Sequence, residues 1–143
     1  MPLRRKLQQL LDELAAVDDP QERLALVLDR AKKIPPLPAA ARTAAHRVPG
    51  CISPVWLHSE MHGDHCIFHG DAESPLVRGL VVLLCEFHRG ATPAQILATD
   101  ADPLDALGLA RHLSPTRRNG LAAVRGAIRA FARQHLATHA SAP

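Results

Sequence analysis

The spacing of apolar residues predicts two helices at the start of the chain. Between residues 3 and 16, leucines recur at intervals of three and four, which is the period of an amphipathic helix. Asp19 and Pro20 then favour a second helix start, because aspartate is a good N-cap and proline fits the first turn. The prolines in the segment 34–38 (IPPLP) end this helix, since each removes a backbone donor.

The apolar period changes to two over residues 55–69, which predicts a β-hairpin with a type II′ turn at Gly63 and Asp64. In this register His62 faces His65, and His58 faces His69. One face of the hairpin is apolar and is expected to meet the core: Val55, Leu57, Met61, Cys66 and Phe68. The other face carries Trp56, His58, Glu60, His62, His65, Ile67 and His69.

Residues 74–89 are apolar nearly all round and predict a buried central helix. Three further helix starts follow, each an N-cap residue before a proline: Thr92–Pro93, Asp102–Pro103 and Ser114–Pro115. The last helix is expected to bury Leu121, Val124, Ile128 and Phe131, with Arg125 and Arg129 facing outward. The layout predicts an α+β fold, a small antiparallel sheet packed against helices. We expect the chain to form a single domain over residues 1–143, with a core of about 3–133 and a frayed tail at 134–143.

Composition and charge argue against a membrane protein, a secreted protein and a nucleic-acid-binding protein. The 143 residues contain no apolar run of membrane-spanning length, and the first residues lack a signal-peptide core, so we expect a cytoplasmic protein without a membrane partner. Three cysteines cannot all pair, which favours a reducing compartment. The segment 106–143 carries six arginines and no carboxylate. No aromatic stacking platform accompanies them, so we expect a solvated helix face and no nucleic-acid partner.

Cys51 is the candidate functional residue. Cys66 and Cys85 fall in apolar patterns and are expected to be buried, as small hydrophobes are. Cys51 instead follows Gly50 and lies between Pro49 and Pro54, so a stiffened loop presents its thiol. A thiolate there could attack, bind metal or exchange sulfur. The absence of a Cys-x-x-Cys pair excludes a dithiol redox motif, and three cysteines cannot form a four-cysteine zinc or cluster site.

Two other functions remain open from the residues alone. His46 lies five residues before Cys51 and could act as its base in a stand-alone thiol enzyme. The predicted hairpin also brings His58, His62, His65 and His69 to one face with Glu60, where zinc or nickel could bind. A solvent-facing polar surface is the favoured interpretation of that face, and no metal ligand is assigned.

Several segments, taken together, resemble the SufE family of sulfur-acceptor proteins. RVPGCISPVW, residues 47–56, is similar to the family's Gly-Cys-x-Ser-x-Val-Trp signature. GDAESPLVRGLVVLL resembles its Gly-Asp segment and buried helix, ATPAQIL its Thr-Pro helix start, and HLSPTRRNGLAAVRGAIRAFA its last helix. DPQERLALVLDRAKKIPPLP resembles its amino-terminal helix and proline-rich loop. The resemblance covers about residues 18–133 in collinear order. It departs from the family at Ile52, often glutamine, and at His46, often asparagine.

The resemblance implies a function. SufE-like proteins take persulfide sulfur from a pyridoxal-phosphate cysteine desulfurase, SufS-like or CsdA-like, and pass it to a scaffold that builds iron–sulfur clusters. The carrier would be Cys51, with a transient persulfide and no resident cofactor, since the pyridoxal phosphate belongs to the partner. Gly50 and Ser53 match the surrounding loop, while Asp71 and Arg117 match positions of partner contact. The implied fold is the one shared with IscU-like scaffolds.

Overall fold

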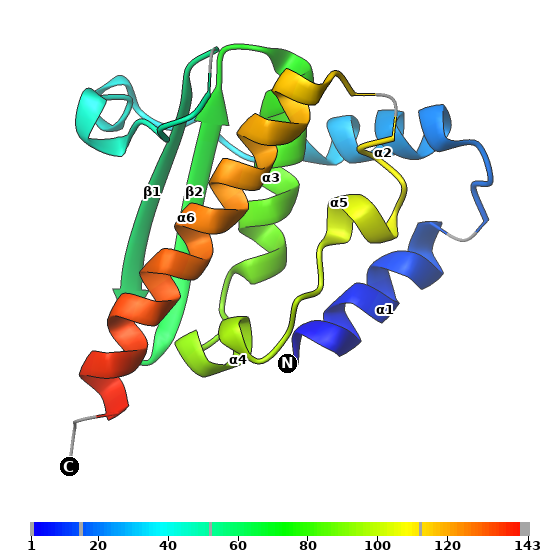
Figure 1. The fold of residues 1–143 in the computed structure, drawn as a ribbon. Helices are drawn as coiled ribbons and strands as arrows, with labels where there is room; N and C mark the ends of the chain where they lie inside the picture. Colours follow the sequence, from blue (N-terminus) through cyan, green and yellow to red (C-terminus); the bar gives the residue numbers. More distant parts are fainter. Residues whose placement is uncertain (1, 15, 52, 112, 141–143) are drawn as a thin grey trace.

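The computed structural model describes residues 2–14, 16–51, 53–111 and 113–140. Figure 1 shows a two-stranded sheet on one side, helix α3 in the middle, and α1 and α2 on the far side. The elements in chain order are α1 (Leu3–Leu14), α2 (Pro20–Lys32), η1 (Ala39–Ala41), η2 (Ala44–His46), β1 (Val55–His62), β2 (His65–Ala72), α3 (Pro75–His88), α4 (Pro93–Leu97), α5 (Pro103–Ala106) and α6 (Pro115–Ala140). This is the predicted α+β class.

The hairpin has the predicted register. His62 pairs with His65 and His58 with His69 in an antiparallel ladder. A type II′ turn requires a positive φ at its first central residue but not at its second. Both conditions are met, because Gly63 has a φ of 63° and the φ of Asp64 is not positive. The predicted core face is confirmed at Val55, Leu57, Cys66 and Phe68, which are buried, whereas Met61 is half-buried against the core. Gly70 lies on this face, where an added Cβ would come within 2.9 Å of Cys85 Sγ. The missing side chain lets α3 pack closely on β2.

Helix α3 is the centre of the fold. It contacts β2, α1, α2, α5 and α6, so it is surrounded and apolar on most sides. Its buried residues are Val77, Gly79, Leu80, Val81, Val82, Leu84, Cys85, Phe87 and His88. The predicted N-cap Thr92 forms a reciprocal capping box with Gln95 at α4. At the start of α3, Ser74 Oγ accepts from Val77 N.

Helix α6 crosses in front of the sheet and α3 (Figure 1) and extends into the predicted tail. Its helical backbone continues through Ala140, whereas the sequence led us to expect fraying from residue 134. Residues 132–140 contain no proline or glycine, and His135 Nδ1 lies 3.0 Å from Phe131 O, one turn earlier. These features favour continued helix. Residues 141–143 lie outside the described part.

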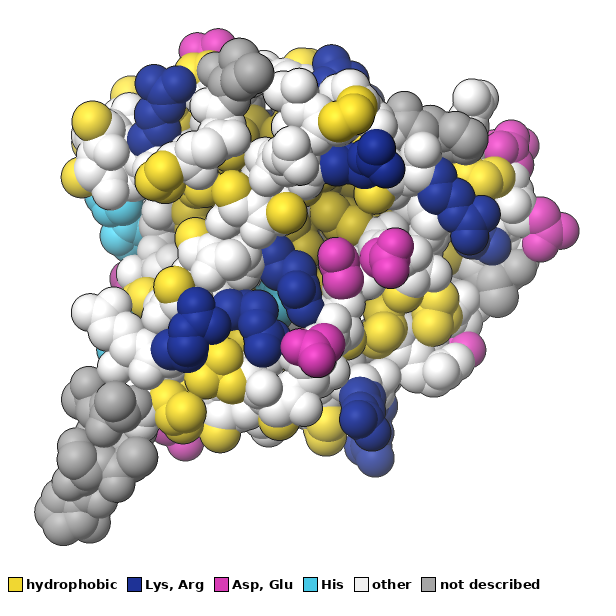
Figure 2. Space-filling model, viewed as in Figure 1, with side chains coloured by type: hydrophobic (Ala, Val, Ile, Leu, Met, Phe, Trp, Pro, Cys, Tyr) yellow, Lys and Arg dark blue, Asp and Glu magenta, His cyan; other side chains and the backbone are white. Residues whose placement is uncertain are grey.

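Two arginines of α6, Arg125 and Arg129, are less solvated than the sequence suggested. Arg129 donates to the carbonyl oxygens of Ile96 (3.0 Å) and Thr99 (2.8 Å), and Arg125 donates to that of Asp100 (2.8 Å). These carbonyls belong to the end of α4 and the turn after it, so the arginines cap a neighbouring helix. Figure 2 shows basic, acidic and apolar side chains interspersed on this face. Among the described helices, none is long and apolar enough to cross a membrane.

Candidate functional site

The loop that carries Cys51 is fixed at both ends to the hairpin. Val48 N donates to Val55 O at 2.9 Å, and Glu73 N donates to Pro54 O at 3.3 Å. The preceding residue, Arg47, forms an isolated bridge with Trp56. Between these anchors Gly50 has a φ of 88°, a conformation that other residues rarely adopt. The backbone therefore turns at Gly50 and directs the next residue toward α6.

The Cys51 thiol rests against α6 and is half-buried. Its Sγ lies 3.6 Å from the carbonyl oxygen of Gly120, to which the S–H donates. It packs at the edge of the hydrophobic core. Burial raises the pKa of the Cys51 thiol above its ordinary value, and the charge of Arg47 opposes that rise. The thiol is therefore predominantly protonated at neutral pH in this position.

Arg117 and Ser53, two predicted partner-contact residues, are exposed near this loop. Arg117 lies in the first turn of α6, three residues before Gly120. The two residues are therefore separated by about 4.5 Å along the helix axis. Its backbone N donates to Ser114 Oγ at 3.2 Å, while its guanidinium has no ion-pair partner among the described residues. Ser53 follows Cys51 by two residues and is exposed. Ile52, where the sequence departs from the family, lies outside the described residues.

Asp71 occupies a different environment from the other predicted residues, since it is 3% exposed. Its carboxylate accepts from Leu37 N (3.1 Å), Ala72 N (2.8 Å) and Arg78 Nε (3.1 Å). Arg78 in turn donates to the carbonyls of Ala31 and Ile34. Asp71 thus ties β2 to α3 and to the proline-rich loop. In this arrangement its carboxylate is enclosed by the proline-rich loop and Arg78 and has a structural role.

The histidines are brought together in part. His46 Nε2 lies 3.1 Å from His58 Nδ1, and His46 Nδ1 lies 3.3 Å from Thr43 Oγ1. Both ring nitrogens of His46 are therefore engaged away from Cys51, which argues against His46 as its base. Glu60 bridges His62 Nε2 (3.1 Å) and His58 Nε2 (3.7 Å). Within the described residues, no group of three or more His, Cys, Asp or Glu side chains could hold a metal ion. The metal-binding interpretation therefore has no geometric support.

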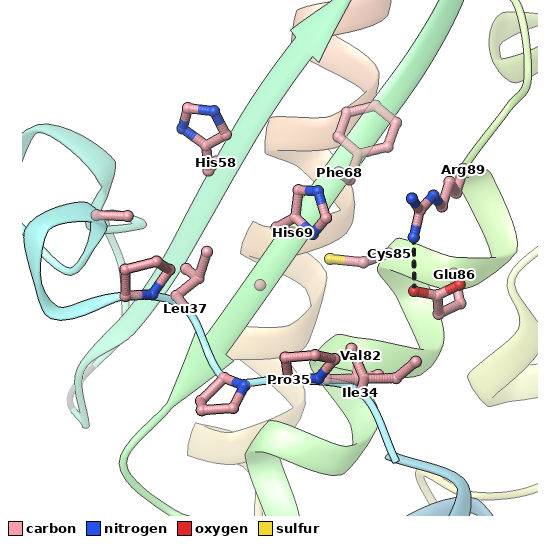
Figure 3. Close-up of a pocket in the computed structure, with 14 residues that line it drawn as sticks. Ile34, Pro35, Leu37, His58, Phe68, His69, Val82, Cys85, Glu86 and Arg89 are labelled. Carbon is pink, nitrogen blue, oxygen red and sulfur yellow. Dashed lines mark ion pairs between the residues drawn. The ribbon is translucent and has the colours of Figure 1, made fainter. Parts of the chain in front are cut away.

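The other two thiols are buried as predicted, Cys66 at 0% exposure and Cys85 at 2%. Burial raises the pKa of Cys66 to about 11 and that of Cys85 to about 12, so both remain protonated. Figure 3 shows Cys85 at a pocket of about 470 Å³ between the proline-rich loop, β2 and α3. Cys51 does not line this pocket. The pocket is also lined by His58, His69 and the ion pair between Glu86 and Arg89, whose charged atoms are 3.6 Å apart.

Gly120 is the site residue that sequence reasoning missed. It lies 69 positions after Cys51, and no periodic pattern links the two residues. The only local signal is a glycine inside a strongly helical segment, where it is disfavoured relative to alanine. Such a glycine does not by itself identify a contact, because Gly126 in the same helix has no atom within 4 Å of an added Cβ.

Comparisons with known proteins show what the chain is similar to. A family model described as "SufE: Fe-S metabolism associated domain" matches residues 8–132. An uncharacterized SufE-like protein of Rhizobium meliloti (strain 1021) is 35% identical over 120 residues, covering 80% of this chain and 86% of the relative. One of Synechocystis sp. is 32% identical over 114 residues, covering 80% and 72%.

A solved structure extends the match to the fold. The solution structure of a hypothetical protein from Thermus thermophilus superposes with a TM-score of 0.75 at 26% identity, covering 96% of this chain and 98% of that one. The family match spans the Cys51 loop, α3 and α6 up to residue 132. The chain belongs to the SufE family and has a role in iron–sulfur metabolism.

Proposed function

We propose that this protein accepts sulfur from a pyridoxal-phosphate cysteine desulfurase and carries it on Cys51 to an iron–sulfur scaffold. One observation supports Cys51 as the sulfur carrier. Of the three cysteines, Cys51 alone is partly exposed, and it lies on the loop that matches the family signature. A sulfur carrier needs a single accessible thiol, because a second thiol nearby would release the bound sulfur by forming a disulfide.

The transfer step balances without an added oxidant or reductant. The Cys51 thiolate attacks the terminal sulfur of the partner's cysteine persulfide. A bond forms between Cys51 Sγ and that sulfur, while the sulfur–sulfur bond in the partner breaks. The partner's cysteine leaves as a thiolate and takes up a proton equivalent to the one that Cys51 lost. Sulfur passes from one protein to the other, and the number of persulfides stays the same.

The charges around the loop support docking against an acidic surface of the partner. Arg47 acts on the Cys51 thiol electrostatically, and Arg117 is exposed one turn before Gly120. Both would also attract a persulfide anion on the partner and stabilise the thiolate that attacks it. Asp71 would contribute indirectly, by fixing the proline-rich loop and the start of α3.

The rival functions have less support. A stand-alone thiol enzyme needs a base beside Cys51, whereas both His46 nitrogens are engaged with His58 and Thr43. A metal-binding role needs a cluster of ligands, and none is present in the described part of the chain. Turnover of a small thiol substrate without a partner would revive the first rival, and zinc or nickel retained at unit stoichiometry would revive the second.

The test is transfer of labelled sulfur. Purified desulfurase is given ³⁵S-cysteine and mixed with the wild-type protein or the Cys51→Ser variant, and label on this protein is measured on non-reducing gels. We expect label on the wild type and none on Cys51→Ser, with Cys85→Ala as the matched control that keeps its label if folded. Label on a folded Cys51→Ser protein would show that the carrier is another residue and would refute the proposal.

A further inference from the structure

The outer edge of β1 is paired only along its first half. Segment 47–48 lies there as a short third strand, because Arg47 bridges to Trp56 and Val48 N donates to Val55 O at 2.9 Å. The chain before Arg47 turns away into η2, in the cyan loop beside the start of β1 in Figure 1. In the described part of the chain, no strand pairs with this edge beyond Trp56. The sheet therefore has an open edge along the second half of β1.

The backbone of β1 directs hydrogen-bonding groups out of this open edge. In an antiparallel ladder, successive residues point their N–H and C=O groups alternately to the two sides of the strand. Val55 points outward, since its carbonyl accepts from Val48. The alternation therefore places the backbone groups of Ser59 and Met61 outward as well. Both residues are partly exposed, and among the described residues neither backbone forms a hydrogen bond on that side.

The opposite edge of the sheet, along β2, is closed at the corresponding level. Cys66 N donates to Ala91 O, and Cys66 O accepts from Gly90 N, both at 2.8 Å. Phe68, the next residue of β2 that points outward, is 0% exposed. Proteins usually cover or pair a strand edge, because an open edge can pair with another chain. The edge at Ser59 and Met61 is accessible, whereas the facing residues of β2 are covered.

A groove with apolar walls runs beside the open edge. It has a volume of about 330 Å³ and lies between β1, segment 45–49 and the second half of α6. Its apolar side chains include Leu57, Ala127, Ala130 and Phe131. Arg47 also lines the groove, is exposed, and forms no ion pair within the described residues. Cys51 does not line it. The groove therefore offers apolar contacts along one face of an added strand and a positive charge at one end.

We propose that the open edge of β1, at Ser59 and Met61, binds an extended peptide segment of a partner protein as an added strand. The peptide runs antiparallel to β1, in line with segment 47–48, and is held by main-chain hydrogen bonds to both residues. Its alternate side chains are apolar and pack against α6. A carboxylate near its carboxyl end meets Arg47. This interaction goes beyond sulfur transfer, and its tests involve no desulfurase, so it stands or falls independently of the proposed function.

The first experiment tethers a strand to the full chain. The peptide Val-Thr-Val-Thr-Val-Glu is fused after Pro143 through a Gly-Ser linker of about 12 residues, which spans about 20 Å on average. The linker can reach, because Gln134 lines the groove and the six helical residues from there to Ala140 rise only about 9 Å. Tethering gives an effective concentration of about 1 mM, so even weak pairing is detected.

Amide hydrogen exchange, measured by NMR, is the readout. We expect the amides of Ser59 and Met61 to exchange at least about tenfold more slowly in the fusion than in the unfused chain. The amide of Cys66 is already paired with Ala91 and should not change. Unchanged exchange at Ser59 and Met61 would overturn the proposal. Protection in the unfused chain that rises with protein concentration would assign the edge to a second copy of this chain and would also overturn it.

The second experiment tests the backbone groups. Ser59→Pro removes the outward N–H but no hydrogen bond to β2, so an edge strand tolerates it. In the fusion, this change should abolish the protection of Met61. Peptides N-methylated at alternate positions provide the same test without changing the protein, when ligated to the chain in place of the fused peptide. Methyl groups on the amides that face β1 should abolish protection, whereas methyl groups on the intervening amides should not. Equal protection by the two methylated peptides would overturn the proposal.

The third experiment tests the groove. Ala130 and Ala122 are both exposed on α6, but Ala130 lines the groove and Ala122 does not. Ala130→Glu places a charged side chain among the apolar walls and repels the carboxylate of the peptide. We expect the fusion with Ala130→Glu to lose the protection of Ser59 and Met61, whereas Ala122→Glu, the matched control, retains it. Full protection in the Ala130→Glu fusion would show that the strand does not occupy the groove and would overturn the proposal.

Discussion

The guanidinium of Arg78 and the carboxylate of Asp71 form an ion pair of 3.1 Å that joins α3 to β2. The side chains are 18% and 4% exposed, so the pair is largely withdrawn from water. Arg78 also donates to Ile34 O at 2.8 Å, and Asp71 accepts from Leu37 N at 3.1 Å. The pair therefore fixes both ends of the proline-rich segment 34–37 over the edge of the sheet.

The first prediction concerns this pair. Asp71→Asn keeps the size of the side chain but removes its charge, leaving Arg78 largely buried without a counter-ion. We expect the free energy of unfolding to fall by on the order of 3 kcal/mol, measured by urea denaturation. Asp100→Asn is the matched control, because Asp100 pairs with Arg129 at 3.6 Å while 99% exposed. Its effect should stay below about 1 kcal/mol.

The same variant distinguishes a structural role of Asp71 from direct partner contact. If Asp71 acts through structure, desulfurase stimulation by Asp71→Asn should follow the folded fraction of the protein. Stimulation lost in fully folded protein, at a temperature where unfolding is negligible, would instead favour a carboxylate that reaches the partner. Equal costs for Asp71→Asn and Asp100→Asn would contradict the importance of the buried pair.

The second prediction separates the three cysteines by stability. Cys66 and Cys85 are buried in the core, so Cys66→Ala and Cys85→Ala should each lower the free energy of unfolding by about 1 kcal/mol or more through the cavity they leave. Cys51→Ala should cost less than either, because that thiol is half-buried at the surface. Urea denaturation of the three single variants provides the comparison. A Cys51→Ala variant less stable than the other two would mean that the loop is part of the core.

The fold could be predicted where the decisive signals are local. Gly63 and Asp64 define a two-residue turn, and once the turn is placed the period of two determines that His58 faces His69. Asp19, Thr92 and Asp102 each cap a helix whose first turn begins with proline, so each helix start is signalled by residues that are neighbours in the sequence. Neither inference requires knowledge of distant contacts.

The site could be predicted only in part because its remaining features join distant segments. Strand alternation puts Asp71 on the outer face with the histidines, and that position normally predicts exposure. It is buried because the proline-rich loop folds over this end of the hairpin, a contact across 34 residues. Likewise Arg129 has the spacing of an outward residue, yet it caps α4 thirty residues earlier. Periodicity reports which face a residue occupies and not what covers that face.

The third prediction concerns His88, which is 2% exposed within the core. Its ring makes edge-to-face contacts with Phe68 and Phe87, and its Nδ1 lies 2.8 Å from Leu84 O. Burial lowers the pKa of His88 to about 4, with smaller contributions from the nearby charges of Arg125, Lys6 and Arg129. The helix carbonyl of Leu84 opposes this shift without reversing it. The imidazole therefore stays neutral in the folded protein throughout the physiological range.

The sign of the pH dependence follows from the two states. In the unfolded chain the pKa of a histidine is about 6.5, so between pH 6.5 and 4 the unfolded chain binds a proton at His88 that the folded protein does not. Stability from neutral His88 is complete above pH 6.5, falls as the pH decreases through this window, and changes no further below the folded pKa. The full difference is on the order of 3 kcal/mol.

Removing His88 should remove this part of the pH dependence. Between pH 7.5 and 4.5 the free energy of unfolding of wild type should fall, and we expect the fall to be about 2–3 kcal/mol smaller for His88→Leu. Urea denaturation of both proteins at both pH values measures the two changes. The carboxylates titrate in both proteins and cancel in the comparison. His65→Gln, a change at an exposed histidine of the hairpin turn, should leave the wild-type dependence nearly intact. If His88→Leu lost as much stability as wild type over this range, His88 would have to be protonated inside the folded core.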